Sequence, residues 1–288
     1  MLPAFFALLS AALFAGNALA VRVALAGTTA TTLTGVSILT NLAALWSLAL
    51  LERQVPTALQ PAALIFVGAG VLAPALARIA LYTAIDLVGV ARSTVVANTT
   101  PIFTAVGAAL FLGERVTTAL ALGTVAVVLG VALTSPAGPE VRPARDTRFG
   151  LLLALSTAVL AAVSIIFRKI GLAVIPHAAV AGALTLTGAS IGLVPLVLLR
   201  GRRESIRAGR RVIAPMLLAG LLSSGGFLAY FLALNLGAAS RVTPLSNTTP
   251  LFAILLLRYA FRTVEPVARR TLAGAVLAVA GVILVVRG

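Results

Sequence analysis

Long apolar stretches separated by short polar breaks constrain the fold of this chain more than any other feature of its sequence. Stretches of about 20 residues recur along the 288 residues, and each can cross the ~30 Å hydrocarbon core of a bilayer as a helix. Hydrophobic residues make up 60% and charged residues 10% of the chain, so too few polar side chains are left to cover a water-soluble surface. Backbone groups must pair within a segment that crosses lipid, so we predict an all-α integral membrane protein.

The pattern predicts ten transmembrane helices in two halves of five. The approximate ranges are 3–24, 33–51, 62–84, 90–112, 117–135, 149–170, 178–199, 212–234, 240–261 and 268–287. A break rich in Pro and Gly divides the chain into repeats 1–138 and 149–288, with a linker over 139–148. The first segment has the length of a signal-peptide core, but no basic region precedes it, so we predict that it is the first helix.

One polar phrase occurs in both halves. Asn98-Thr99-Thr100-Pro101 returns 149 residues later as Asn247-Thr248-Thr249-Pro250, and each copy precedes an apolar residue and a Phe. Further on, Glu114, Gly123 and Gly130 match Glu265, Gly274 and Gly281. Because five helices per half send the second half into the membrane from the opposite side, we predict inverted repeats, an architecture that many transporters use.

Arg78 is the most informative single residue. It lies within the third predicted helix, with Tyr82 one turn further on the same face. An Arg at the centre of a membrane helix costs roughly 2.5–3.5 kcal/mol on insertion scales, so it normally faces a cavity or a partner. No Asp or Glu lies in the middle of a predicted segment. We therefore predict that Arg78 binds a substrate carboxylate, the alternative being an Arg that caps backbone carbonyls.

Other polar residues at membrane depth are candidates for binding the substrate. The set is Asn17, Asn98, Asn247, Tyr230 and Ser164, and the alternative role for each is to hold helices together by hydrogen bonds. Pro101 and Pro250 each remove a helix hydrogen bond, so we predict a kink and a hinge at both. The alternative is a kink at a helix contact.

Several functions are excluded or disfavoured. The net charge of +15 comes mainly from breaks between apolar segments, which indicates membrane orientation and lipid contact and argues against nucleic acid. No catalytic triad, metal-ligand cluster or phosphate-binding loop is evident, so we predict no enzyme activity, no catalytic or metal site and no cofactor. The lack of a membrane-embedded carboxylate argues against a cation or multidrug antiporter.

The chain resembles the EamA-like ten-helix branch of the drug/metabolite transporter superfamily. The motifs that carry the resemblance lie in residues 91–131: Ala91-Arg92-Ser93, Asn98 to Pro101, Gly113-Glu114-Arg115, Gly123 and Gly130. The second copy departs from the pattern, because Arg262-Thr263-Val264-Glu265-Pro266 replaces the Gly-Glu-Arg turn. The resemblance implies a bacterial inner-membrane carrier that exports small metabolites, often amino acids. It also implies a central cavity lined by helices 1, 3, 4, 6, 8 and 9.

Two alternatives and one conflict stay open at this point. The substrate is a small metabolite, most consistently an amino acid, but a drug or nucleotide-sugar carrier fits the same superfamily. In a different class, a membrane scaffold without transport would also have this hydropathy. The distribution of basic residues places both termini outside the cell, whereas the resemblance places them inside.

Overall fold

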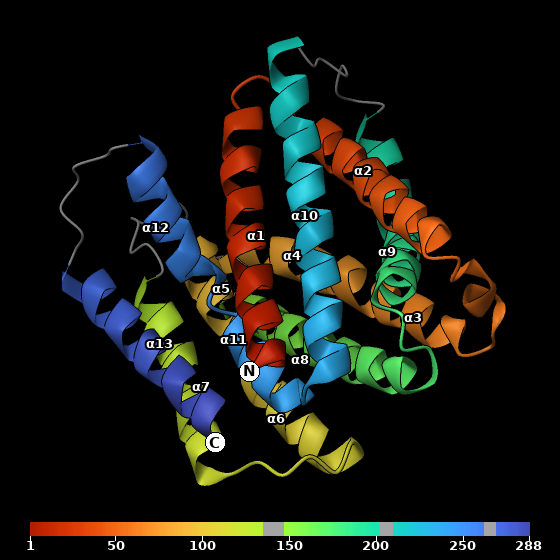
Figure 1. The fold of residues 1–288 in the computed structure, drawn as a ribbon. Coiled ribbons are helices and arrows are strands. Elements are labelled where there is room, and N and C mark those ends of the chain that lie inside the picture. The colour runs from red at the N-terminus through yellow and green to blue at the C-terminus, as the bar shows by residue number, and fades with distance from the viewer. Residues whose placement is uncertain (135–146, 202–209, 262–268) are drawn as a thin grey trace.

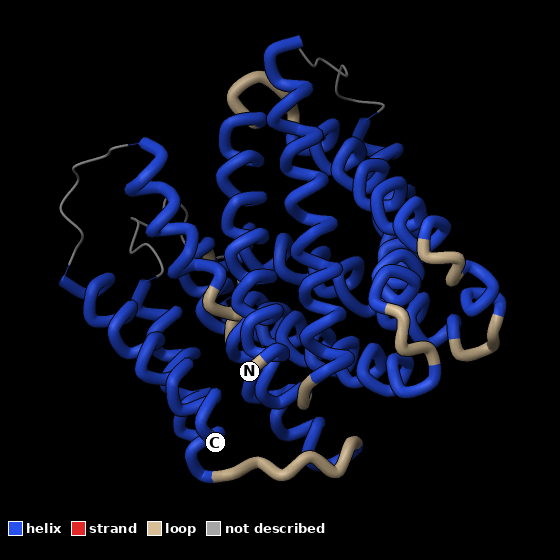
Figure 2. The backbone as a smooth tube through the Cα atoms, viewed as in Figure 1, coloured by secondary structure: helices blue, strands red, loops and turns tan. Residues whose placement is uncertain are grey.

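The computed structural model describes residues 1–134, 147–201, 210–261 and 269–288, and these residues form a bundle of helices joined by short loops (Figures 1 and 2). The first half contains α1 (Leu2–Ala24), α2 (Ala30–Leu51), η1 (Val55–Leu59), α3 (Ala63–Gly70), η2 (Val71–Leu76), α4 (Ala77–Val88), α5 (Val90–Ala97), α6 (Thr100–Phe111) and α7 (Thr118–Thr134). The second half contains α8 (Thr147–Val174), α9 (Ala178–Gly201), α10 (Arg210–Leu236), α11 (Ala239–Ser246), α12 (Thr249–Phe261) and α13 (Arg269–Arg287).

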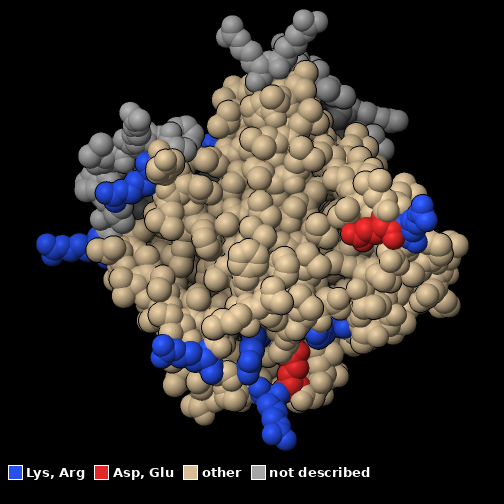
Figure 3. Space-filling view, viewed as in Figure 1, with Lys and Arg blue, Asp and Glu red and all other residues tan. Residues whose placement is uncertain are grey.

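The helices have the length and composition of membrane-spanning segments. Among the described residues, seven helical stretches are long and apolar enough to cross a bilayer, and 118–134 and 178–194 are shorter apolar helices. In Figure 3 the coloured charged side chains lie toward the edges of the visible face, and its centre is free of them. These features are consistent with the predicted multi-pass helical membrane protein.

Three of the predicted helices are interrupted, and the interruption in the third segment corrects the sequence analysis, which expected kinks only at Pro101 and Pro250. The segment predicted as one helix over 62–84 breaks at η2, where Ala73 leaves helical geometry (φ −149°, ψ 127°) just before Pro74. The segments 90–112 and 240–261 break at the two copies of the repeated phrase. Grouped across these three breaks, the helices make up the ten predicted segments.

The two repeated prolines lie in the first turn after short breaks, and Asn98 (φ −70°, ψ 0°) and Thr99 (φ −76°, ψ −2°) keep right-handed helical angles there. The break is therefore a local interruption at the position of the predicted kink, and the hinge stays a prediction. Pro101 lies in the first turn of α6, and Pro250 is the second residue of α12. A helix leaves its first N–H groups without internal partners, so proline is tolerated there at little cost. The predicted linker 139–148 lies mostly outside the described residues, and α8 already begins at Thr147.

Helices of one half pack mainly on helices of the other. The first segment of the first half, α1, runs along α10, the third segment of the second half (Figure 1). The corresponding contact with the halves exchanged is also present. The first segment of the second half, α8, packs on α3 and α4, which belong to the third segment of the first half. The second segments α2 and α9 pack on each other, as do the last segments α7 and α13.

The contact between α7 and α13 depends on glycines that the repeat places in both helices. A Cβ atom on Gly130 would lie 2.6 Å from the Gly274 carbonyl oxygen, and one on Gly281 would lie 2.7 Å from that of Gly123. The pairing of 123 with 281 and of 130 with 274 makes the two helices antiparallel. Small residues allow membrane helices to approach this closely.

We predict that Gly130→Ala destabilises the protein, whereas Gly68→Ala does not. The new methyl group on Gly130 would overlap the backbone of α13, and overpacking of this kind costs about 1–3 kcal/mol. A Cβ atom on Gly68, also within a helix, has no neighbouring atom within 4 Å. Thermal unfolding of the purified protein in detergent should show a lower midpoint for Gly130→Ala alone. Equal midpoints for the two variants would contradict the close contact.

Candidate transport cavities

Two cavities adjoin the break in the third segment, and both are lined by residues of the two halves. The first, of about 280 Å³, is here called the Arg78 cavity. The second, of about 270 Å³, is called the Arg168 cavity. Pro74 lines the first, Ala73 lines the second, and Phe227 of α10 lines both. The helix break and Phe227 therefore form the partition between them.

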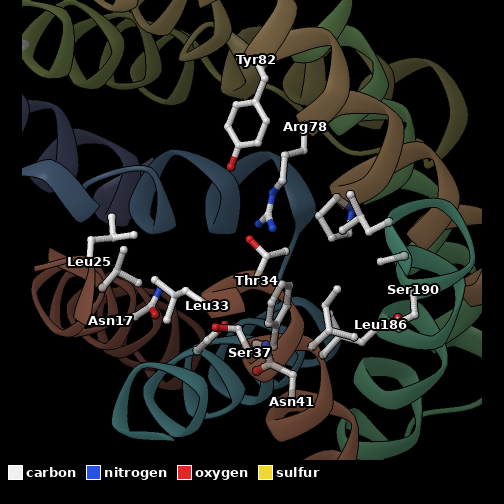
Figure 4. A pocket seen from close by; sticks show the side chains of 17 residues that line it. Asn17, Leu25, Leu33, Thr34, Ser37, Asn41, Arg78, Tyr82, Leu186 and Ser190 are labelled. Carbon is white, nitrogen blue, oxygen red and sulfur yellow. The ribbon is translucent and has the colours of Figure 1, made fainter. Parts of the chain in front are cut away.

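The Arg78 cavity collects three of the predicted site residues. Arg78 and Tyr82 project from α4 into the space that Thr34 and Ser37 border, and Asn17 reaches it from α1 (Figure 4). The predicted spacing of one helical turn explains why Arg78 and Tyr82 share this face. The cavity is also lined by polar residues that were not among the predicted site residues: Thr34, Ser37, Asn41, Ser190 and Ser223.

These added residues come from α2, α9 and α10, which lie far apart in the sequence. Asn41 is already engaged, because its side-chain oxygen accepts a hydrogen bond from the Ser224 hydroxyl at 2.8 Å. Isolated Ser and Thr residues are common in membrane helices as packing groups, so composition alone gave no reason to single out those that line a cavity.

The Arg168 cavity lies where the two copies of the repeated phrase meet. Asn98, Asn247 and Tyr230, all predicted site residues, line it. The Asn247 side-chain amide donates a hydrogen bond to the Asn98 backbone carbonyl at 3.2 Å. The two helix breaks, 149 residues apart in sequence, are therefore joined directly to each other beside this cavity.

Arg168 is the residue that the sequence analysis missed. It was taken to lie near the end of a helix over 149–170, but α8 continues to Val174 and buries Arg168 inside the bundle. Its Nη2 donates to the carbonyl oxygen of Ala73, and its guanidinium lies 5.7 Å from the centre of the Phe231 ring. The adjacent Lys169 instead donates to the carbonyls of Leu234 and Gly237, at 2.7 and 2.9 Å.

Ser164 lines neither cavity. Its buried hydroxyl donates to the carbonyl of Ala69 at 2.7 Å and lies 3.1 Å from that of Ala73. This arrangement favours the alternative role for Ser164, in which it satisfies backbone groups exposed by the break in the third segment.

Glu114, from the Gly-Glu-Arg turn, joins the first half to the second. Its carboxylate accepts hydrogen bonds from the backbone N–H groups of Ala239 and Ser240, at 2.7 and 2.9 Å. It also accepts one from the Ser240 hydroxyl at 2.6 Å. These N–H groups open α11, where a negative charge is stabilised by the helix dipole. The motif therefore positions the helix that leads into the second copy of the repeated phrase.

A bundle of long apolar helices with cavities between its two halves is the architecture of a multi-pass membrane protein. The chain belongs to the EamA-like transporter family, whose model matches residues 1–135 and 148–287. The predicted resemblance is thereby confirmed, and the protein is a membrane transporter and not an enzyme.

Two further comparisons agree with this assignment. The chain is 30% identical over 199 residues to an uncharacterized transporter of Archaeoglobus fulgidus, a match that covers 68% of this chain and 67% of the relative. A crystal structure of a protein with 20% sequence identity superimposes with a TM-score of 0.80, and the match covers 98% of this chain and 95% of the other. The latter similarity concerns the fold alone.

We predict that the two repeated asparagines differ in their contribution to stability. Asn247→Ala removes the donor to the Asn98 carbonyl and should destabilise the protein by about 0.5–1.5 kcal/mol. Asn98→Ala leaves this bond intact, because the acceptor is a backbone oxygen. Thermal unfolding in detergent should therefore show the lower midpoint for Asn247→Ala. The reverse order would contradict the contact between the two breaks.

Proposed function

We propose that this transporter is a secondary carrier of the bacterial inner membrane that exports small metabolites, most consistently amino acids, by alternating access. The observation that carries the proposal is the convergence of Arg78, Tyr82 and Asn17 in one cavity between the two halves. A guanidinium, a phenol and an amide together match the charged and polar groups of a small carboxylate-bearing solute.

Arg78 binds the carboxylate of the solute in this proposal. Its planar guanidinium presents paired N–H donors that fit the two oxygens of a carboxylate. The Tyr82 hydroxyl adds a further donor, and the Asn17 side-chain oxygen can accept from an ammonium group. Neither cavity is lined by an Asp or Glu from the described residues, which favours an anionic group over a purely cationic drug.

Several contacts support inverted repeats. The equivalent helices α7 and α13 run antiparallel, as expected when two copies enter the membrane from opposite sides. The packing of α1 on α10 has its counterpart in the packing of α8 on α3 and α4. The family model also matches the two halves separately. In this proposal the halves rock about the Arg78 cavity, and the helix starts at Pro101 and Pro250 act as hinges.

Solute counterflow into proteoliposomes tests the proposed substrate. The panel contains labelled neutral, aromatic and basic amino acids, their decarboxylated amine analogues and a lipophilic cation. We expect flux of amino acids and none of the amines, because the site recognises the carboxylate. Flux of amines or of the lipophilic cation would indicate a drug carrier instead. Competition by a nucleotide sugar would indicate a nucleotide-sugar carrier. Absence of all flux would favour a scaffold.

Substitution of Arg78 tests the proposed site. Arg78→Ala should lower the kcat/KM of carboxylate solutes about tenfold or more, since a hydrogen bond to a charged group contributes about 1.5–3 kcal/mol. Arg78→Lys keeps the charge but loses the paired donors, so an intermediate loss is expected. Arg148→Ala, an exposed position at the start of α8, is the matched control. Unchanged flux in both Arg78 variants, at equal expression, would refute this role.

A further inference from the structure

The Arg168 cavity contains two buried polar groups that lack well-formed hydrogen bonds. Arg168 is 6% exposed and Tyr230 is 8% exposed. Within the part of the chain that the structure describes, the Arg168 Nε and the Tyr230 hydroxyl lack a well-formed hydrogen bond, and the Tyr230 hydroxyl lies near the Thr243 side chain. Leaving a buried donor unpaired costs about 1–3 kcal/mol, and more when the group is charged. Two such groups on one cavity therefore indicate a ligand that accepts from both.

Nearby polar side chains in the cavity are already engaged. The Thr243 hydroxyl donates to the Ala239 carbonyl at 2.8 Å, and the Asn247 amide donates to the Asn98 carbonyl. The Arg168 guanidinium itself has one backbone acceptor, the Ala73 carbonyl, and no carboxylate among the described residues lines the cavity. A carbonyl oxygen carries no net charge, so the positive charge of Arg168 is left without a counter-ion.

We propose that Arg168 and Tyr230 form a second anion site, which takes the carboxylate of the transported solute. The proposal rests on the proposed function for the chemistry of the ligand. The Arg168 Nε–H and the Tyr230 O–H donate to the carboxylate oxygens. The rings of Phe14 and Phe227, which also line this cavity, cover the apolar part of the solute.

The second site adjoins the first across the partition formed by the helix break and Phe227. Phe227 lines both cavities, and its ring meets that of Phe14 edge to face, with 5.2 Å between the ring centroids. Ala73 and Pro74, consecutive residues at the helix break, face the second and the first cavity respectively. A carboxylate that passes this partition leaves one guanidinium, Arg78, and meets another, Arg168. The charge of the solute is therefore paired on both sides of the partition.

Binding to the full-length protein in detergent tests this site. Trp46, the single tryptophan, packs on the same buried cluster as Phe227, so its fluorescence can report ligand entry. The probes are L-leucine, 4-methylpentanoate, which lacks the ammonium group, and leucinamide, which lacks the carboxylate. In an Arg78→Gln background, where the first site is disabled, we expect the two carboxylates to bind and leucinamide not to bind.

Tyr230→Phe is the decisive variant in that background. It removes a hydroxyl that lacks a well-formed hydrogen bond, so it should leave the unfolding midpoint unchanged or higher while raising the Kd of both carboxylates about tenfold. The matched control is Tyr259→Phe, at a position that is 88% exposed on α12, and this variant should not change the Kd in the Arg78→Gln background. Arg168→Lys, which keeps the charge, should weaken carboxylate binding without enabling leucinamide to bind.

The outcomes separate this inference from the proposed function. An unchanged Kd in both Tyr230→Phe and Arg168→Lys would overturn it, as would equal binding of leucinamide or no binding of either carboxylate. Carboxylate binding that depends on Tyr230, found together with no counterflow of any solute, would support the second site and refute the proposed transport of amino acids.

Discussion

The break in the third segment is the constraint on which the rest of the structure depends. Backbone carbonyls cannot stay unpaired in a membrane bundle, and the non-helical geometry at Ala73 leaves some of them without helical partners. Two side chains of α8 supply the missing donors: Ser164 bonds the carbonyl of Ala69, and Arg168 bonds that of Ala73. This requirement fixes α8 of the second half against the first half and draws a charged side chain into the interior.

The same break positions both cavities. Ala73 and Pro74 are consecutive at the break, and they line the Arg168 cavity and the Arg78 cavity respectively. Phe227 of α10 lines both cavities and completes the partition between them. Around this centre, the connections between the halves use polar groups at helix ends, such as the Glu114 carboxylate on the start of α11 and the Asn247 amide on Asn98. Helix ends offer unpaired backbone groups, so contacts there are specific, while the glycine-lined contact of α7 with α13 supplies close packing.

The sequence predicted the pairing of Arg78 with Tyr82 because helical periodicity alone puts them on one face. It failed for Arg168 because a charge near the predicted end of an apolar run is usually a boundary, and the neighbouring Lys169 strengthened that interpretation. It also failed for the break at Ala73, since Pro74 in a long apolar segment is compatible with a simple kink. The polar residues of α2 went unselected because nothing local distinguishes a cavity-lining hydroxyl from one that serves packing.

Hydropathy, the repeated phrase and the family motifs were enough to determine a ten-segment helical membrane protein and its transporter family. These properties follow from local patterns, because the length of an apolar run and the spacing of residues on a helix depend on neighbours in the chain. Tertiary structure alone decided which polar side chains line a cavity together and which are hydrogen-bonded to backbone groups. Those outcomes depend on contacts between segments far apart in the chain, such as Ser164 with Ala69, which are 95 residues apart, and Asn247 with Asn98, which are 149 residues apart.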